Sequence, residues 1–197
     1  MKLAVFVSGR GSNLAAILAA GIPVDVVVCN VPEAAALGHA RAAGVPVLAR
    51  PDQGSRAERD AWVVERLRER QVNFVALAGY NRVFDRCVLE AFPERIINTH
   101  PSLLPAFAGG VDPEPLRLAL EYGVKVSGCT VHFVTDDLDH GPVIAQACVP
   151  VLPGDTVATL GERIRGQEHQ LLPAVLRWFA EGRVHLDGRV VYAPTWP

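Results

Sequence analysis

The chain has 197 residues, of which 50% are hydrophobic and 20% are charged, as is typical of a globular domain with a sizeable core. Its formal net charge of −2 offers no broad cationic surface, so we expect neither nucleic acid nor a membrane as a main partner. A small anionic ligand remains compatible with this charge, because a few backbone amides and single cations suffice to bind one.

In the first half of the chain, short apolar segments alternate with segments of helical periodicity. Strands that are apolar throughout and separated by helices are typical of a parallel sheet covered on both faces. The sequence therefore predicts an α/β fold with an open, mostly parallel Rossmann-like sheet. The expected strands are 3–7, 24–29, 45–48, 74–78 and 96–98, and the expected helices are 13–20, 33–43, 56–70 and 85–92.

The second half has a different pattern, which predicts antiparallel strands. Two strand-like runs are joined by a segment rich in turn residues, and Asp187-Gly188 indicates a later hairpin within residues 184–192. Asp155 or Thr156 can cap a long helix that reaches about residue 168, and Pro173 should kink it or start a new segment reaching residue 180. The other expected elements are a helix at 115–121 and strands at 129–134 and 143–151. We expect one domain, residues 1–197.

The cysteines and the N-terminus indicate a soluble cytoplasmic protein. No C-x-x-C pair occurs, and each cysteine lies in an apolar run, which predicts buried free thiols rather than disulfides or a zinc site. The first apolar run is too short for a signal peptide, and no segment approaches the ~20 apolar residues that span a bilayer. The cysteines are Cys29, Cys87, Cys129 and Cys148.

The segment Ser8-Gly-Arg-Gly-Ser-Asn13 lies between the first strand and the first helix, where it could bind an anion. Its glycines allow a sharp turn, and the helix N-terminus with Ser12 and Asn13 offers donors. The segment is not a Walker A loop, and Leu14 replaces the third glycine of a dinucleotide fingerprint, so a single phosphate fits better. The alternative is a capped strand–helix turn without a ligand.

A second candidate site is Asn98 and His100, at the carboxyl end of the fifth strand. Alternation along an extended backbone places their side chains on one side, where an amide and an imidazole can face one point. Such a pair can stabilise an oxyanion and move a proton, and open α/β sheets build their sites at this edge. A lone histidine can equally be a polar core or surface residue.

A third candidate is the turn at residues 136–139, which carries Asp136, Asp137 and Asp139; its alternative is a solvated turn. His132 precedes it and is expected to support rather than react. A hydrolase triad is disfavoured, because no Gly-x-Ser-x-Gly elbow occurs and Ser102 has no evident base. A metal site also lacks support, since His132 and Asp139 have no third ligand at a suitable spacing. Non-covalent chemistry remains, in which the site orients, polarises and transfers a proton.

Four motifs, in this order and at this spacing, resemble those of the phosphoribosylglycinamide formyltransferase family, over residues 1 to about 181. Asn-x-His-Pro-Ser-Leu-Leu-Pro with a downstream Leu-Asp-x-Gly-Pro is specific to formyltransferases that use formyltetrahydrofolate. Gly-x-Gly-Ser-Asn narrows the resemblance to the glycinamide ribonucleotide branch and its deformylase relatives. The motifs are Ser8-Gly-Arg-Gly-Ser-Asn13, Leu77-Ala-Gly-Tyr-Asn-Arg82, Asn98-Thr-His-Pro-Ser-Leu-Leu-Pro105 and Val131-His-Phe-Val-Thr-Asp-Asp-Leu-Asp-His-Gly-Pro-Val143.

The resemblance implies formyl transfer from 10-formyltetrahydrofolate to the amine of 5-phosphoribosylglycinamide in purine biosynthesis, with Asn98, His100 and Asp139 as the catalytic set. It implies no metal and no ATP, and the enzyme would be a monomer or homodimer. The N-terminal half would bind the nucleotide and the C-terminal half the folate, with the site between them. The implied ribonucleotide-binding residues are Gly11, Ser12, Asn13 and Glu168. The implied folate-binding residues are Tyr80, Asn81, Arg82, Val83, Asp136 and Asp137.

Two departures from the family pattern concern the substrate loops. Residues 106–109, Ala-Phe-Ala-Gly, replace a cation followed by an aromatic residue and Pro-Gly, and the next residues lack the histidines often found there. Only Gly109 is carried over from this loop, and weakly. Gly128-Cys-Thr-Val-His132 replaces the usual Gly-Thr-Ser-Val-His and keeps the histidine.

Three rival functions remain open at this point. Formyltetrahydrofolate deformylase resembles this chain fused to an N-terminal regulatory domain, for which we expect no room because the first strand begins at once. Methionyl-tRNA formyltransferase carries a C-terminal RNA-binding domain and a basic surface, which this sequence lacks. A non-catalytic nucleotide-binding module would need the phosphate loop but would have no use for Asn98, His100 and Asp139.

Overall fold

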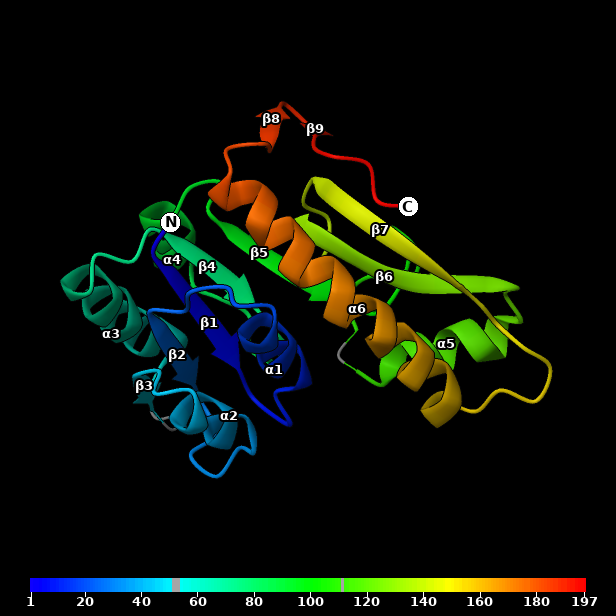
Figure 1. Cartoon of the computed structure of the whole chain (residues 1–197), viewed down its shortest axis with the longest axis horizontal. Helices are drawn as coiled ribbons and strands as arrows, with labels where there is room; N and C mark the ends of the chain where they lie inside the picture. The colour runs from blue at the N-terminus through cyan, green and yellow to red at the C-terminus, as the bar shows by residue number, and fades with distance from the viewer. Residues whose placement is uncertain (51–53, 111) are drawn as a thin grey trace. The chain divides into compact units, whose positions relative to one another are not determined.

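The structure, a computed structural model, describes residues 1–50, 54–110 and 112–197 (Figure 1). The chain forms two compact units, Met1–Asn98 and Thr99–Pro197, and each is described by itself below. The seven-stranded sheet has the strand order β3-β2-β1-β4-β5-β6-β7, and a separate two-stranded sheet is formed by β8 and β9. The predicted α/β fold with an open, mostly parallel sheet is therefore confirmed.

The parallel strands of the first unit have β1 at their centre. All five residues of β1 are fully buried, as expected for a strand covered on both faces. β1 pairs in parallel with β2 and β4, β2 pairs with β3, and β4 pairs with the first residues of β5. The strands are β1 (Leu3–Val7), β2 (Val26–Cys29), β3 (Val47–Ala49), β4 (Phe74–Leu77) and β5 (Ile96–His100).

The four helices of the first unit form two pairs in contact, α1 with α2 and α3 with α4. Successive connections β1–α1–β2–α2–β3 run one way along the sheet, whereas the connection through α3 returns to β4. Since such crossovers are right-handed, the two pairs lie on opposite faces of the sheet. The helices are α1 (Ser12–Ala19), α2 (Ala36–Ala42), α3 (Arg56–Glu69) and α4 (Arg86–Ala91).

The second unit is built on an antiparallel pair of strands, as the sequence predicts. β6 (Val126–Phe133) pairs with β7 (Val143–Pro150), and the long helix α6 (Val157–Ala180) packs along both strands (Figure 1). Helix α5 (Glu114–Tyr122) contacts α6. The predicted hairpin is present as β8 (His185–Asp187) and β9 (Val190–Tyr192), and β9 also contacts β7.

Three details differ from the expectations. β5 continues through His100, because Pro101 stops the strand only at its own position. α6 is continuous through Pro173, so the expectation of a new segment there is wrong; the apolar face on either side of the proline is buried against the strands, and this packing outweighs one lost backbone hydrogen bond. Cys148 is exposed rather than buried, since alternation along β7 turns it outward.

All four cysteines are free thiols, as predicted; Cys29 and Cys129 are buried, whereas Cys87 is only half-buried. Burial raises the pKa of the Cys129 thiol to about 12, so this side chain is a neutral core residue at ordinary pH. No helix among the described residues is long and apolar enough to cross a membrane.

Candidate active site

Gly11 lies at the start of α1 and sets how closely that helix approaches α2. Its φ of 76° is in the left-handed region, which favours glycine. A Cβ atom at position 11 would lie 2.5 Å from the Cβ and 2.6 Å from the Cα of Ala36, far inside contact distance. Only glycine fits here, and the first turn of α1 then presents backbone N–H groups beside Ser12 and the buried Asn13. This arrangement suits an anion.

A ring of three hydrogen bonds ties the start of this loop to residues 79–81. The Ser8 hydroxyl donates to Asn30 Oδ1 at 2.6 Å and accepts from the Asn81 N–H at 3.0 Å, and Asn30 Nδ2 donates to Asn81 Oδ1 at 3.1 Å. The Ser8 N–H also donates to the Gly79 carbonyl. The sequence reasoning missed Asn30, although a polar residue directly after the apolar strand β2 was the signal that could have found it.

The segment from Tyr80 to Val83 has an anchored backbone and exposed tips. The Tyr80 ring packs at 5.2 Å from Phe6, between ring centroids, and the Val83 carbonyl accepts from the buried Arg59 guanidinium at 2.9 Å. Arg82 and Val83 are exposed, and Arg82 donates to the Asn81 carbonyl at 3.2 Å. The anchored backbone fixes where these exposed groups reach the surface of the first unit.

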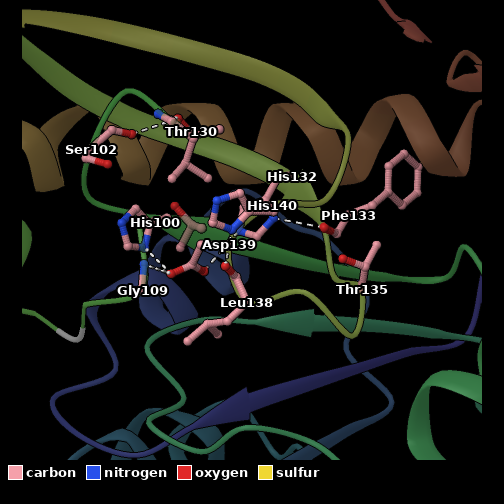
Figure 2. Close-up of polar contacts among 12 residues, drawn as sticks. His100, Ser102, Gly109, Thr130, His132, Phe133, Thr135, Leu138, Asp139 and His140 are labelled. Carbon is pink, nitrogen blue, oxygen red and sulfur yellow. Dashed lines mark hydrogen bonds and ion pairs between the residues drawn. The ribbon is translucent and has the colours of Figure 1, made fainter. Parts of the chain in front are cut away.

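In the second unit, the Asp139 carboxylate lies between two imidazoles (Figure 2). Asp139 Oδ2 is 3.4 Å from His100 Nδ1, and Asp139 Oδ1 is 3.6 Å from His132 Nε2. The three residues are 8%, 3% and 1% exposed, respectively. Such a buried carboxylate with two imidazoles can hold and transfer protons away from bulk water.

Backbone groups hold each member of this cluster. The Gly109 N–H donates to Asp139 Oδ2 at 3.0 Å, His100 Nε2 bonds the Phe107 carbonyl at 3.1 Å, and His132 Nδ1 bonds the Phe133 carbonyl at 2.8 Å. Asp139 has a φ of 58°, a left-handed conformation that aspartate tolerates better than most residues. Phe107 could not be predicted from the sequence, because its contribution is a backbone carbonyl that no side-chain pattern reveals.

Asn98 and Glu168 belong to different units. Asn98 is half-buried in β5 and precedes His100 by two residues, so alternation along the strand directs both side chains to one side. Glu168, on α6, is buried and accepts a hydrogen bond from the Thr99 hydroxyl at 3.4 Å.

Comparisons with known proteins agree over almost the whole chain. A family model described as "Formyl transferase" matches residues 1–176. The phosphoribosylglycinamide formyltransferase of Haemophilus influenzae is 36% identical over 97% of this chain and 92% of its own length. The chain belongs to the phosphoribosylglycinamide formyltransferase family.

Two further relatives, a solved structure and a trifunctional protein, also match this chain. The crystal structure of glycinamide ribonucleotide transformylase 1 from Symbiobacterium toebii is 48% identical, with a TM-score of 0.94 over 98% of this chain and 93% of that chain. The human trifunctional purine biosynthetic protein adenosine-3 is 40% identical over 97% of this chain. The chain spans only 20% of the length of that trifunctional relative.

Within the second unit, the structure brings His100, His132 and Asp139 together. The residues Gly11 to Asn13 and Tyr80 to Val83 belong to the first unit. Asp136 and Asp137 are exposed in the turn that leads to Asp139. Ser102 is fully buried and donates to the Ala106 carbonyl at 2.6 Å, so it is a turn residue. No group of three His, Cys, Asp or Glu side chains that could hold a metal occurs within residues 1–50, 54–110 and 112–197.

His132 is predicted to make the protein less stable in acid. Burial is the main cause that lowers the pKa of His132 below its ordinary value, despite the opposing effect of Asp139. As the pH falls through that ordinary value, near ~6.5, the unfolded chain binds a proton on His132 before the folded chain does. The free energy of unfolding should therefore fall as the pH decreases from about 7.5 to 5.5, and fall less in His132→Gln.

Urea-induced unfolding of the wild type and the variant at both pH values measures this difference. His140→Gln, which changes an exposed histidine in the same region, is the control and should follow the wild type. An equal loss of stability in wild type and His132→Gln would show that His132 does not contribute.

Thr130 anchors the turn that follows His100, and its hydroxyl is fully buried. The hydroxyl donates to the Ser102 carbonyl at 2.7 Å and accepts from the Leu104 N–H and Gln146 Nε2, each at 3.0 Å. Thr130→Val leaves the buried Leu104 N–H without this acceptor and the buried Ser102 carbonyl without this donor, so we expect a loss of about 1–3 kcal/mol in the free energy of unfolding.

Denaturant unfolding measures this loss, and Thr135→Val serves as the matched control. The Thr135 hydroxyl is exposed and donates to the Asp137 carbonyl, so its removal should change the free energy by less than about 0.5 kcal/mol. Similar losses in both variants would contradict the anchoring role of Thr130.

Proposed function

We propose that the chain transfers a formyl group from 10-formyltetrahydrofolate to the glycyl amine of 5-phosphoribosylglycinamide, in the cytoplasm, as a step of purine biosynthesis. The observation that carries the proposal is the buried carboxylate of Asp139 at 3.4 Å from His100, within a chain of this family. A direct transfer needs groups that stabilise an oxyanion and move one proton, and this pair meets the second requirement.

In the proposed reaction, the lone pair of the glycyl amine attacks the formyl carbon, and the carbonyl electrons move onto the oxygen. The Asn98 amide donates to that oxyanion, and the positive charge of the protonated His100 stabilises it. The oxyanion then reforms the carbonyl, the bond from carbon to N10 of the folate breaks, and N10 takes up a proton. The amine loses one proton. Asp139 carries this proton to N10, directly or through water, and ends the reaction unchanged.

The binding roles follow the same proposal. Gly11, Ser12 and Asn13 hold the 5′-phosphate, because the first turn of α1 offers donors and a favourable helix dipole. Glu168 accepts from the ribose hydroxyls. The pterin lies on the backbone of Tyr80–Val83 and of residues 136–137, with Arg82 toward the acidic tail of the folate.

The test is a transfer assay with purified protein, 10-formyltetrahydrofolate and 5-phosphoribosylglycinamide, followed by the appearance of formylated ribonucleotide. A parallel reaction without the ribonucleotide measures hydrolysis of the donor. We expect transfer in the first reaction and little hydrolysis in the second. Hydrolysis that does not depend on the acceptor would assign a deformylase, and no reaction in either tube, with ribonucleotide binding retained, would assign a non-catalytic module.

A further inference from the structure

Both ring nitrogens of His100 face hydrogen-bond acceptors. Nε2 lies 3.1 Å from the Phe107 carbonyl oxygen, and Nδ1 lies 3.4 Å from Asp139 Oδ2. A backbone carbonyl accepts but never donates, so the bond to Phe107 requires a hydrogen on Nε2. The second nitrogen, Nδ1, faces a carboxylate, which can exchange a proton with it.

The direction of the Phe107 carbonyl depends on an uncommon backbone conformation. Phe107 has a φ of 57°, in the left-handed region that a non-glycine residue rarely adopts. Both sides of the residue are fixed: the Ala106 carbonyl accepts from the Ser102 hydroxyl at 2.6 Å, and the Gly109 N–H donates to Asp139 at 3.0 Å. Uncommon backbone held by its neighbours often accompanies a functional role.

We propose that the backbone carbonyl of Phe107 is a positioning group that fixes the tautomer of His100, so that Nδ1, beside Asp139, is the nitrogen that gains and loses the proton. The catalytic meaning of this assignment rests on the proposed formyl transfer. Phe107 acts through His100 and does not touch the reacting atoms. Its carbonyl places the exchangeable proton on the side of the ring where Asp139 can receive it.

The other groups that face His100 are compatible with this assignment. Asp139 comes from the segment after β6, and His132 comes from β6 itself. The segment that carries Phe107, residues 101–110, has no charged side chain. The Phe133 carbonyl binds His132 Nδ1 at 2.8 Å and so directs His132 Nε2 toward the second oxygen of Asp139. Each imidazole thus has one nitrogen on a carbonyl and the other toward the same carboxylate.

Nuclear magnetic resonance of protein labelled with 15N-histidine tests the assignment without reference to activity. The signals of His100 are identified among the 6 histidines by their loss in His100→Gln. We expect Nε2 to keep the shift of a hydrogen-bearing nitrogen at every pH, while the change with pH is confined to Nδ1. Loss of the hydrogen from Nε2 at any pH, or the absence of a pH-dependent change on Nδ1, overturns the proposal.

Two variants of Phe107 test its effect on the reaction. Phe107→Val and Phe107→Asn both remove the aromatic ring, but only asparagine tolerates a φ near 57°. We expect Phe107→Val to lower kcat by about tenfold, the order expected for one hydrogen bond to an ionisable group, with KM for the ribonucleotide within about twofold. Phe107→Asn should keep kcat within about threefold and retain the wild-type His100 spectrum.

Equal losses of kcat in the two variants would assign the effect to the missing ring and overturn the role of the carbonyl. The two proposals fail separately. A wild type without transfer activity but with the expected His100 spectrum would refute the proposed function and leave the tautomer assignment standing. Full transfer activity with a different His100 tautomer would refute the tautomer assignment and leave the proposed function standing.

Discussion

Asp139→Asn is expected to lower kcat for formyl transfer by about a thousandfold, while the affinity for the ribonucleotide stays within about threefold of the wild type. Asparagine has nearly the same size, but its amide has no negative charge to pair with His100 and cannot receive the proton of the amine. The asparagine side chain also ends in an NH2 group, which can only donate. In the wild type, by contrast, both carboxylate oxygens of Asp139 are acceptors, and they lie beside the Gly109 N–H and two imidazoles.

Steady-state transfer kinetics give kcat, and titration calorimetry with the ribonucleotide gives the dissociation constant. Asp187→Asn is a suitable control, because Asp187 is exposed in the hairpin and asparagine before glycine also favours that turn. A loss of ribonucleotide affinity as large as the loss of kcat would argue that Asp139 holds the fold or the substrate rather than the proton.

Gly11→Ala should have the second large effect, a loss of about 3 kcal/mol in the free energy of unfolding together with most of the ribonucleotide affinity. The left-handed φ of 76° costs an alanine about 1–2 kcal/mol. The new methyl group would also lie 2.5 Å from the Cβ of Ala36, and such overpacking costs about 1–3 kcal/mol more. Any shift of α1 that relieves the contact moves the backbone N–H groups proposed to hold the phosphate.

Gly21→Ala separates the cost of the left-handed backbone from the cost of the close contact with Ala36. Gly21 follows the same helix and has a φ of 70°, but a Cβ there meets nothing within 4 Å. Its cost should be about 1 kcal/mol, with ribonucleotide affinity unchanged. Denaturant unfolding and calorimetry measure both quantities, and equal losses at the two glycines would show that the contact with Ala36 is unimportant.

The sequence predicted the order of strands and helices because apolar periodicity and turn residues are local signals. Asn98 and His100 were identifiable for the same reason, as polar residues that follow two isoleucines at a strand end. The approach of Asp139 to His100 could not be obtained from periodicity, since it depends on how the segment after β6 folds back. That expectation came from the resemblance to the family, and the distance of 3.4 Å is consistent with it.

Other features could not be predicted, and each has a physical reason. The Phe107 carbonyl and the Gly109 N–H belong to the backbone, which every residue type carries. Thr130 is recognisable only when its partners, distant in sequence, are known. The continuity of α6 through Pro173 depends on the surface that buries the helix, which outweighs the local preference of proline.

The left-handed backbone at Asp139 limits which residues can replace it during evolution. Few residue types tolerate a φ of 58°, chiefly glycine, asparagine and aspartate, and of these aspartate alone carries a charge. Glutamate keeps the charge but favours this conformation less, although Glu94 has a φ of 56°, so one position must satisfy two independent requirements. With the proposed role of Asp139, a lineage that abandons the chemistry but keeps the fold is expected to drift to asparagine or glycine here, which would make this residue a marker for that role.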